Sequence, residues 1–355
     1  MRSTQSSEIC SVTDFLPKRM LVTGGAGFIG CNFVWHMLAE HDELTIVTLD
    51  MLTYAGSLRN LEDMAAVDRH SFVQADINER AVVDKLLREH DIDCIVHFAA
   101  ESHVDRSISG PQAFMATNIL GTYELLEAAR DFWLGERSYE PGDCLFHHIS
   151  TDEVYGSLGP NDPPFCETTP YAPNSPYSAS KAAADHLVRA WHHTFGLPVV
   201  TTNCSNNYGP YQHAEKLIPT IIRSCINQQE IPVYGDGSNI RDWLYVVDHC
   251  AAIDAAICRG RRGETYNIGG LNEWANIDIV RLICRLLDDR RPMAESYETL
   301  INFVEDRAGH DWRYAIDATK TADELGWQPT ETFESGISKT IDWYLDHEDY
   351  LGAES

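Results

Sequence analysis

Gly24-Gly25-Ala26-Gly27-Phe28-Ile29-Gly30 is the stretch that decides the fold. It follows the apolar run 19–23, which predicts a short strand, and the residues after it have the apolar spacing of a helix. In such a unit one glycine permits the tight turn, one lets a pyrophosphate approach the backbone, and one packs the helix against the strand. The N-terminus of the helix then offers free N–H groups to phosphate. The stretch therefore predicts a dinucleotide site.

A carboxylate follows the glycines at the distance that this kind of site requires. Residues 44–49 predict a second strand, and the strand ends at Asp50, about 20 residues beyond the glycines. An acidic group there bonds the ribose hydroxyls of adenosine and repels a 2′-phosphate. The sequence therefore favours NAD over NADP.

Strands and helices continue to alternate after Asp50. Runs at 72–75, 94–98, 145–149, 199–203 and 265–268 predict strands; 82–87, 111–130, 177–195, 247–257 and 333–345 predict helices. We expect an α/β fold with a doubly wound parallel Rossmann sheet and a smaller mixed α/β substrate lobe. The expected division is an N-terminal extension (1–17), an NAD-binding domain (18–203, to which 236–268 returns), and a substrate-binding lobe (204–235 and 269–355).

Composition narrows the function classes. The 355 residues include 27 basic and 54 acidic side chains, a net charge of −27, which argues against a nucleic-acid or anionic-membrane partner. A salty cytoplasm or solubility alone would account for this acidity. Ten cysteines without a Cys-x-x-Cys pair suit free thiols in a reducing compartment. We expect a cytoplasmic protein, because no secretory signal or membrane-length apolar run is visible. His97 and His103 lack a ligand cluster, so we expect no metal.

Ser150-Thr151-Asp152-Glu153-Val154-Tyr155-Gly156 begins where the predicted strand 145–149 ends, the edge at which ligands bind in open α/β sheets. In isolation this stretch would be a solvated turn. However, Tyr177 and Lys181 lie four residues apart on a predicted helix, so they share one face. We expect the lysine ammonium to lower the tyrosine pKa and make the phenol a usable base.

These motifs together resemble the extended short-chain dehydrogenase/reductases that act on nucleotide sugars. The finer resemblance is to the 4,6-dehydratase branch of that family, and it extends over about residues 18–347. It is carried by the stretches 150–156, 204–211, 215–219 and 240–246.

The resemblance implies NAD as cofactor, dTDP-glucose as the nucleotide-sugar substrate, and a homodimer formed through the helices near 111–130 and 176–195. The implied cofactor contacts are Gly24, Gly27, Phe28, Ile29, Gly30, Asp50, Leu52, Thr53, Asp76, Ile77, Ala99, Ala100, Ser102, Thr117, Tyr177, Lys181 and Asn206. The implied substrate contacts are Ser102, Thr151, Asn207, Lys216, Leu217, Arg241, Asn276, Arg307 and His310.

The resemblance also implies a redox-neutral loss of water. Tyr177, held as phenolate by Lys181, removes the proton of the sugar 4-hydroxyl, which Thr151 hydrogen-bonds, while hydride leaves C4. Glu153 then removes the C5 proton and a protonated Asp152 donates to O6. Returning the hydride to C6 gives a 4-keto-6-deoxy sugar. Mutual repulsion between adjacent carboxyl groups favours one ionised and one protonated partner.

The sequence departs from the family at three positions and leaves other functions open. Ala214 and Ala308 stand where proline is common, and Trp312 stands where a second arginine is common. A nucleotide-sugar 4-epimerase would use the same cofactor, tyrosine and lysine but would not need Asp152 and Glu153. Another nucleoside-diphosphate-hexose 4,6-dehydratase and a non-catalytic NAD-binding regulator are the remaining alternatives.

Overall fold

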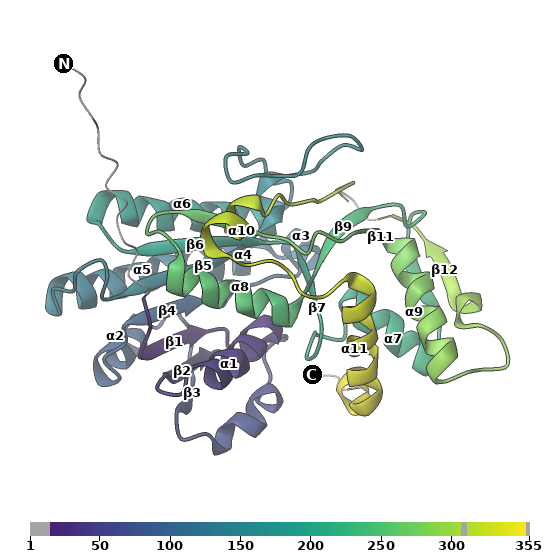
Figure 1. Ribbon diagram of the computed structural model, residues 1–355, viewed down its shortest axis with the longest axis horizontal. Helices are drawn as coiled ribbons and strands as arrows, with labels where there is room; N and C mark the ends of the chain where they lie inside the picture. Colours follow the sequence, from purple (N-terminus) through teal and green to yellow (C-terminus); the bar gives the residue numbers. More distant parts are fainter. Residues whose placement is uncertain (1–14, 307–310, 353–355) are drawn as a thin grey trace.

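A seven-stranded sheet forms the centre of the computed structural model, which describes residues 15–306 and 311–352. The strand order is β10-β6-β5-β4-β1-β2-β3, and all neighbouring strands run parallel. Figure 1 labels the six strands from β6 to β3. The strands are β1 (Arg19–Thr23), β2 (Thr45–Asp50), β3 (His70–Gln74), β4 (Cys94–His97), β5 (Leu145–Thr151), β6 (Val199–Cys204) and β10 (Thr265–Ile268). The predicted doubly wound Rossmann sheet is confirmed.

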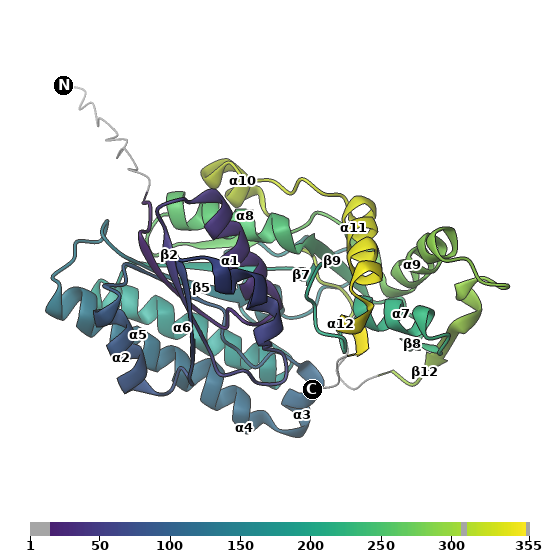
Figure 2. The same cartoon turned by 90° about the horizontal axis from the view of Figure 1, so that it is seen from below.

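Helices cover both faces of the sheet (Figure 2). α1 (Phe28–Glu40) and α8 (Val246–Arg259) pack on one face, whereas α2 (Arg80–Glu89), α5 (Thr122–Ala129) and α6 (Pro176–Phe195) pack on the other. Successive side chains of a strand point to opposite faces. Both faces of this sheet are therefore apolar, which explains why its strands read as continuous apolar runs.

The helix predicted for 111–130 is longer and less regular than expected. It begins with α4 (Pro111–Phe114), continues through a π-helical segment (Met115–Gly121) and α5, and ends in a second π-helical segment (Arg130–Glu136). A Cβ atom at Gly121 would lie 2.4 Å from the side chain of Ile77. The glycine therefore allows this helix to approach the loop after β3 closely.

A smaller lobe lies beside the carboxyl ends of the central strands. It contains a mixed sheet of β7 (Asn206–Tyr208), β9 (Ile240–Tyr245) and β11 (Glu273–Ala275), and a parallel pair, β8 (Ile231–Tyr234) with β12 (Ile301–Val304). Its helices are α7 (Leu217–Ile226), α9 (Asn276–Arg290) and α11 (Phe333–Asp346), which share one apolar core.

Two of the connections between the lobe and the main sheet are very short, whereas residues 269–272 and 326–332 form longer ones. Ser205 alone separates β6 from β7, and β9 ends at Tyr245, where α8 of the main layer begins with the next residue. The remaining helices are α3 (Val104–Ser109), α10 (Thr319–Leu325), α12 (Glu348–Gly352) and three 3₁₀ segments (Leu58–Ala66, Asp152–Tyr155 and Tyr297–Leu300). Within residues 15–306 and 311–352, no helix has the length and apolar character needed to cross a membrane.

Candidate active site

The glycine turn joins β1 to α1 and begins the site. Gly24 has φ +72°, and a Cβ atom there would lie 2.6 Å from the backbone nitrogen of Ala99. At Gly30 a Cβ atom would lie 2.3 Å from the carbonyl oxygen of Gly24. These two glycines therefore supply the tight turn and the close helix packing. Gly27 caps α1 without a side chain, so no cap side chain bonds the first backbone N–H groups of the helix, and Phe28, Ile29 and Gly30 line the pocket.

Asp50, at the end of β2, holds the turn. Its Oδ2 accepts a hydrogen bond from the Ala26 backbone N–H at 3.0 Å, and its Oδ1 accepts one from Leu52 at 2.8 Å. Burial raises the pKa of this carboxyl group, and the two N–H donors oppose that rise. The carboxylate lines the pocket beside the turn. Its contact with an adenosine ribose remains a prediction.

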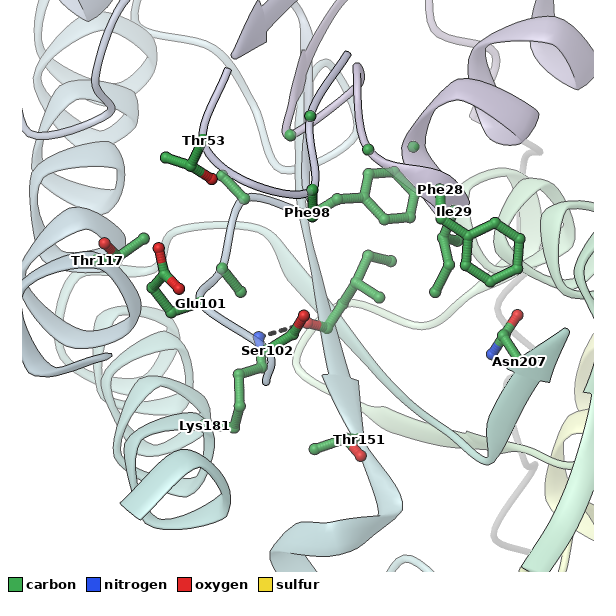
Figure 3. Close-up of a pocket in the computed structure, with 18 of the residues that line it drawn as sticks. Phe28, Ile29, Thr53, Phe98, Glu101, Ser102, Thr117, Thr151, Lys181 and Asn207 are labelled. Carbon is green, nitrogen blue, oxygen red and sulfur yellow. Dashed lines mark hydrogen bonds between the residues drawn. The ribbon is translucent and has the colours of Figure 1, made fainter. Parts of the chain in front are cut away.

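The segment after β4 contributes a carboxylate that the sequence prediction missed. Glu101 lines the pocket and lies with Thr53 and Thr117 on one side, opposite Asn207 (Figure 3). Its backbone is fixed by Asn118, whose Oδ1 accepts from the Glu101 N–H at 2.8 Å and whose amide donates to Ser180 Oγ at 2.8 Å. The sequence could have indicated Glu101, because it directly follows the small residues Ala99 and Ala100 after β4.

Thr151 is the last residue of β5, and the two carboxylates follow it in a 3₁₀ turn. The Thr151 hydroxyl accepts from the Glu153 N–H and donates to Asp152 Oδ1, both at 3.3 Å. Asp152 is buried, and its Oδ2 has no hydrogen-bond partner among the described residues. Burial, followed by the charges of Glu153 and Asp242, raises the pKa of Asp152 well above its usual value. The arrangement therefore favours a protonated Asp152.

Tyr177 and Lys181 lie in the first turns of α6. Ser175 caps this helix through reciprocal hydrogen bonds with Ser178. The side chains of Tyr177 and Lys181 are buried and line the pocket with Thr151. Figure 3 shows Lys181 close to the strand that ends at Thr151. The Lys181 ammonium donates to the Ile149 carbonyl at 2.7 Å.

The expected lowering of the Tyr177 pKa is wrong for the protein alone. Burial, followed by the charge of Glu153, raises the pKa well above 10, and a hydrogen bond with Thr151 opposes this rise only in part. The reason is that burial and the neighbouring carboxylate of Glu153 both disfavour a phenolate.

Most of the predicted site residues meet in one pocket. It is lined by Gly24, Gly27, Phe28, Ile29, Gly30, Asp50, Thr53, Asp76, Ile77, Ala99, Ala100, Ser102, Thr117, Thr151, Asp152, Glu153, Tyr177, Lys181, Asn206, Asn207 and Lys216. Leu52, Leu217, Arg241 and Asn276 are not among its lining residues. Arg307 and His310 lie outside the described residues. Cys204, Ser205, Gln212 and His213 also line the pocket and were not predicted.

Arg241, expected to bind diphosphate, is buried in the lobe. Its guanidinium donates to the carbonyl oxygens of Ile240 at 2.7 Å and Asp311 at 2.9 Å. It also lies over the Tyr314 ring, 4.3 Å from the ring centroid. These contacts tie β9 to the chain after residue 310. A contact of Arg241 with phosphate remains a prediction.

His97 has a structural role in the central sheet. It is buried, with Nδ1 2.7 Å from the Thr23 hydroxyl and Nε2 3.0 Å from the Thr122 hydroxyl. Among the described residues, no group of three or more His, Cys, Asp or Glu side chains is arranged to hold a metal ion.

A dinucleotide turn and a Tyr-x-x-x-Lys helix that open into the same pocket are typical of Rossmann-fold enzymes of the short-chain dehydrogenase/reductase type. Comparison with known proteins then defines the family. The chain belongs to the GDP-mannose 4,6 dehydratase family, whose model matches residues 21–340.

Similar proteins agree with this family and cover nearly the whole chain. The dTDP-glucose 4,6-dehydratase of Xanthomonas campestris pv. campestris (strain B100) is 56% identical over 333 residues, 93% of this chain and 94% of that protein. The dTDP-glucose 4,6-dehydratase 1 of Escherichia coli K12 is 54% identical and covers 92% of both chains. The crystal structure of dTDP-glucose 4,6-dehydratase from Streptomyces venezuelae, with NAD and TYD bound, has a TM-score of 0.86, 43% identity, and coverage of 94% and 98%. The family resemblance predicted from the sequence is confirmed.

Proposed function

We propose that this protein is an NAD-dependent hydro-lyase that converts dTDP-glucose into dTDP-4-keto-6-deoxyglucose. The observation that carries the proposal is the placement of Thr151, Asp152 and Glu153 at the end of β5, in one pocket with the glycine turn and with Tyr177. The similar dTDP-glucose 4,6-dehydratases support both the reaction and the substrate.

The pocket fits NAD. Gly24, Gly27 and Gly30 line the pocket without side chains, so the turn offers backbone of the kind that a pyrophosphate needs to approach. Asp50, Asp76, Ala99, Ala100 and Ser102 line the pocket. In this proposal the two aspartates contact the adenosine, and the other three residues lie along the middle of the cofactor. When bound, NAD supplies reversible hydride acceptance. In this proposal Leu52, Thr53, Ile77, Thr117 and Asn206 complete the set of cofactor contacts.

Tyr177 removes the proton of the sugar 4-hydroxyl as C4 is oxidised to the ketone. Its pKa is raised in the protein alone, so the step requires added positive charge near the phenol. Lys181 supplies one such charge, and NAD in its oxidised form would supply another when bound. Thr151 hydrogen-bonds O4 and orients the substrate for this step.

Asp152 and Glu153 carry out the elimination. The 4-ketone acidifies the C5–H bond, and Glu153 removes that proton as general base. Asp152, which its buried position favours in the protonated form, donates its proton to O6 as water leaves C6. The hydride removed from C4 is returned to C6, and C5 receives a proton from solvent. A 4-epimerase has no step that uses this carboxyl pair.

Incorporation of deuterium at C5 of the product tests the proposal. We expect product formed in D₂O to carry deuterium at C5, and we expect the 4-ketone to form from dTDP-glucose faster than from UDP-, GDP- or CDP-glucose. Epimerised hexose without deuterium would favour a 4-epimerase, and the absence of turnover with all four sugars would favour a regulator.

The variant Glu153→Gln separates the two half-reactions. We expect it to oxidise C4 and accumulate reduced cofactor at 340 nm, while losing dehydration by about 10²–10⁴-fold. Leu158→Val is the control, because Leu158 also follows β5 and is buried but does not line the pocket. Full turnover by Glu153→Gln would contradict the assignment of the C5 base.

The substrate contacts and the division of the chain are part of the same proposal. Asn207 and Lys216 line the pocket from the lobe side. We assign the sugar nucleotide to them and to Ser102, Leu217, Arg241, Asn276, Arg307 and His310. The expected division gave 18–203 with 236–268 to the NAD-binding part, and 204–235 with 269–355 to the substrate lobe. Of residues 236–268, α8 and β10 join the main sheet, whereas β9 pairs within the lobe sheet, so we assign β9 to the lobe. The expected N-terminal extension, 1–17, lies largely outside the described residues.

A homodimer is proposed through the helices of residues 111–130 and 176–195. Leu120, Tyr123 and Phe195 on these helices are 57%, 38% and 43% exposed, which is high for large apolar side chains. Sedimentation that shows only monomer at working concentration would contradict the dimer. We also propose the cytoplasm as the compartment, because the cysteines of the described part of the chain are free thiols.

A further inference from the structure

A buried carboxylate lies beneath the active site and has no part in the reaction described above. Asp185 of α6 is 6% exposed. Its Oδ1 lies 3.1 Å from His148 Nε2, and its Oδ2 accepts from the hydroxyl groups of Ser150 and Tyr171, each at 2.9 Å. A carboxylate with three side-chain partners has a fixed position.

Asp185 and Lys181 hold the same part of β5. They are four residues apart in α6 and therefore share one face of the helix. Asp185 binds the side chains of His148 and Ser150, and the Lys181 ammonium binds the carbonyl oxygen of Ile149 between them. Thr151 is the next residue of the strand. The pair therefore positions the strand end that carries the reacting groups.

Asp185 also favours the protonated, charged form of Lys181. Burial lowers the pKa of Lys181, and the largest opposing effect is the charge of Asp185. The titratable groups that interact electrostatically with the ammonium are Asp185 of α6, Cys204 of β6, His97 of β4 and His148 of β5. Tyr177, Asp152 and Glu153 line the same pocket as Lys181. Burial lowers the pKa of both imidazoles, so they remain neutral at pH 7.

We propose that Asp185 is a positioning residue of the reaction, which keeps the Lys181 ammonium charged and fixes the end of β5 beneath Thr151. The inference rests on the proposed function, because it assigns to Lys181 the stabilisation of the Tyr177 phenolate. A buried ammonium that loses its counter-charge tends to lose its proton.

The test compares Asp185→Asn with Tyr171→Phe. Both remove a hydrogen bond from the same network, but only Asp185→Asn removes the charge. In Asp185→Asn we expect the alkaline limb of the plot of kcat against pH to move by about one pH unit or more to lower pH. We expect KM to change less than about twofold. Asp185→Glu should restore part of the shift, whereas Tyr171→Phe should keep the wild-type limb.

A second measurement reports on Lys181 without turnover. Competitive acetylation followed by peptide mass spectrometry gives the pH at which Lys181 loses its proton. We expect this pH to fall in Asp185→Asn and to stay unchanged in Tyr171→Phe. In the wild-type protein Lys181 should remain protonated at pH 7.5, and this readout stands even where Asp185→Asn does not fold.

The outcomes separate the inference from the proposed function. A wild-type enzyme without 4-ketone formation would overturn the proposed function. An active wild type with the same alkaline limb in Asp185→Asn and Tyr171→Phe, or with a neutral Lys181 at pH 7.5, would overturn the role of Asp185.

Discussion

Acid should destabilise this protein through its buried imidazoles, and His147 allows the effect to be measured. His147 lies in β5, fully buried, with Nε2 3.1 Å from the Thr202 hydroxyl. Burial, followed by the charge of His148, lowers its pKa to about 3. The unfolded chain therefore binds a proton at His147 near pH 6.5, whereas the folded protein does not. The free energy of unfolding is therefore not reduced by His147 above pH 6.5, and it falls progressively as the pH decreases from 6.5 toward 3.

The magnitude follows from the two pKa values. With about 6.5 in the unfolded chain and about 3 in the folded protein, His147 costs about 1.4 kcal/mol of folding free energy at pH 5.5. At the same pH it contributes about 1.2 kcal/mol per pH unit to the slope of the unfolding free energy. Buried carboxyl groups such as Asp93, whose pKa is raised, contribute to the slope with the opposite sign.

The assay is urea unfolding of wild type and His147→Gln at pH 5.0, 5.5, 6.0 and 7.0. The variant will be less stable at pH 7, but its slope between pH 5 and 6 should be shallower by about 1.2 kcal/mol per pH unit. His193→Gln, at an exposed position of α6, should keep the wild-type slope. Equal slopes in wild type and His147→Gln would refute the reasoning.

Three further predictions follow from the structure. Gly30→Ala should weaken NAD binding, measured by calorimetry, more than about tenfold, because the added Cβ would meet the Gly24 carbonyl. Gly135→Ala, where a Cβ atom would meet open space, should leave NAD binding unchanged. Raising NaCl from about 0.05 to about 0.5 M should raise Tm by screening the net charge of −27, and an unchanged Tm would count against self-repulsion. Tyr350→Phe should lose about 1–2 kcal/mol of stability, since its hydroxyl bonds Asn60 and the Tyr211 carbonyl, whereas Tyr234→Phe at an exposed position should lose little.

The sequence predicted the parts of the site that depend on local pattern. The glycine turn, the strand end at Thr151, and the four-residue spacing of Tyr177 and Lys181 are each set by neighbours in the chain, and the structure brings them into one pocket. The same holds for the parallel sheet, whose strands are apolar because helices cover both faces.

What the sequence could not predict depends on contacts between distant segments. The pKa of Tyr177 is governed by burial and by Glu153 from another element, so the spacing to Lys181 gave the wrong direction. The inward course of Arg241 depends on the chain around Asp311, 70 residues away. The sequence has no signal that shows whether the helix predicted for 111–130 stops at Arg130 or continues. The hydrogen bonds of Asp185 to β5 join residues that are 35 and 37 positions apart in the sequence.

The single residue between β6 and β7 has a consequence for how substrate enters. A hinge between two rigid bodies needs several residues whose dihedral angles can change together. Ser205 leaves no such length, and Tyr245 passes into α8 without an intervening residue. These two connections should therefore limit rotation of the lobe against the sheet, and any larger movement would have to use the longer connections, residues 269–272 and 326–332. Exchange of substrate and product would then depend on the surface segments around the pocket mouth, such as the chain near His213, and the rate of release would be set by local rearrangement there.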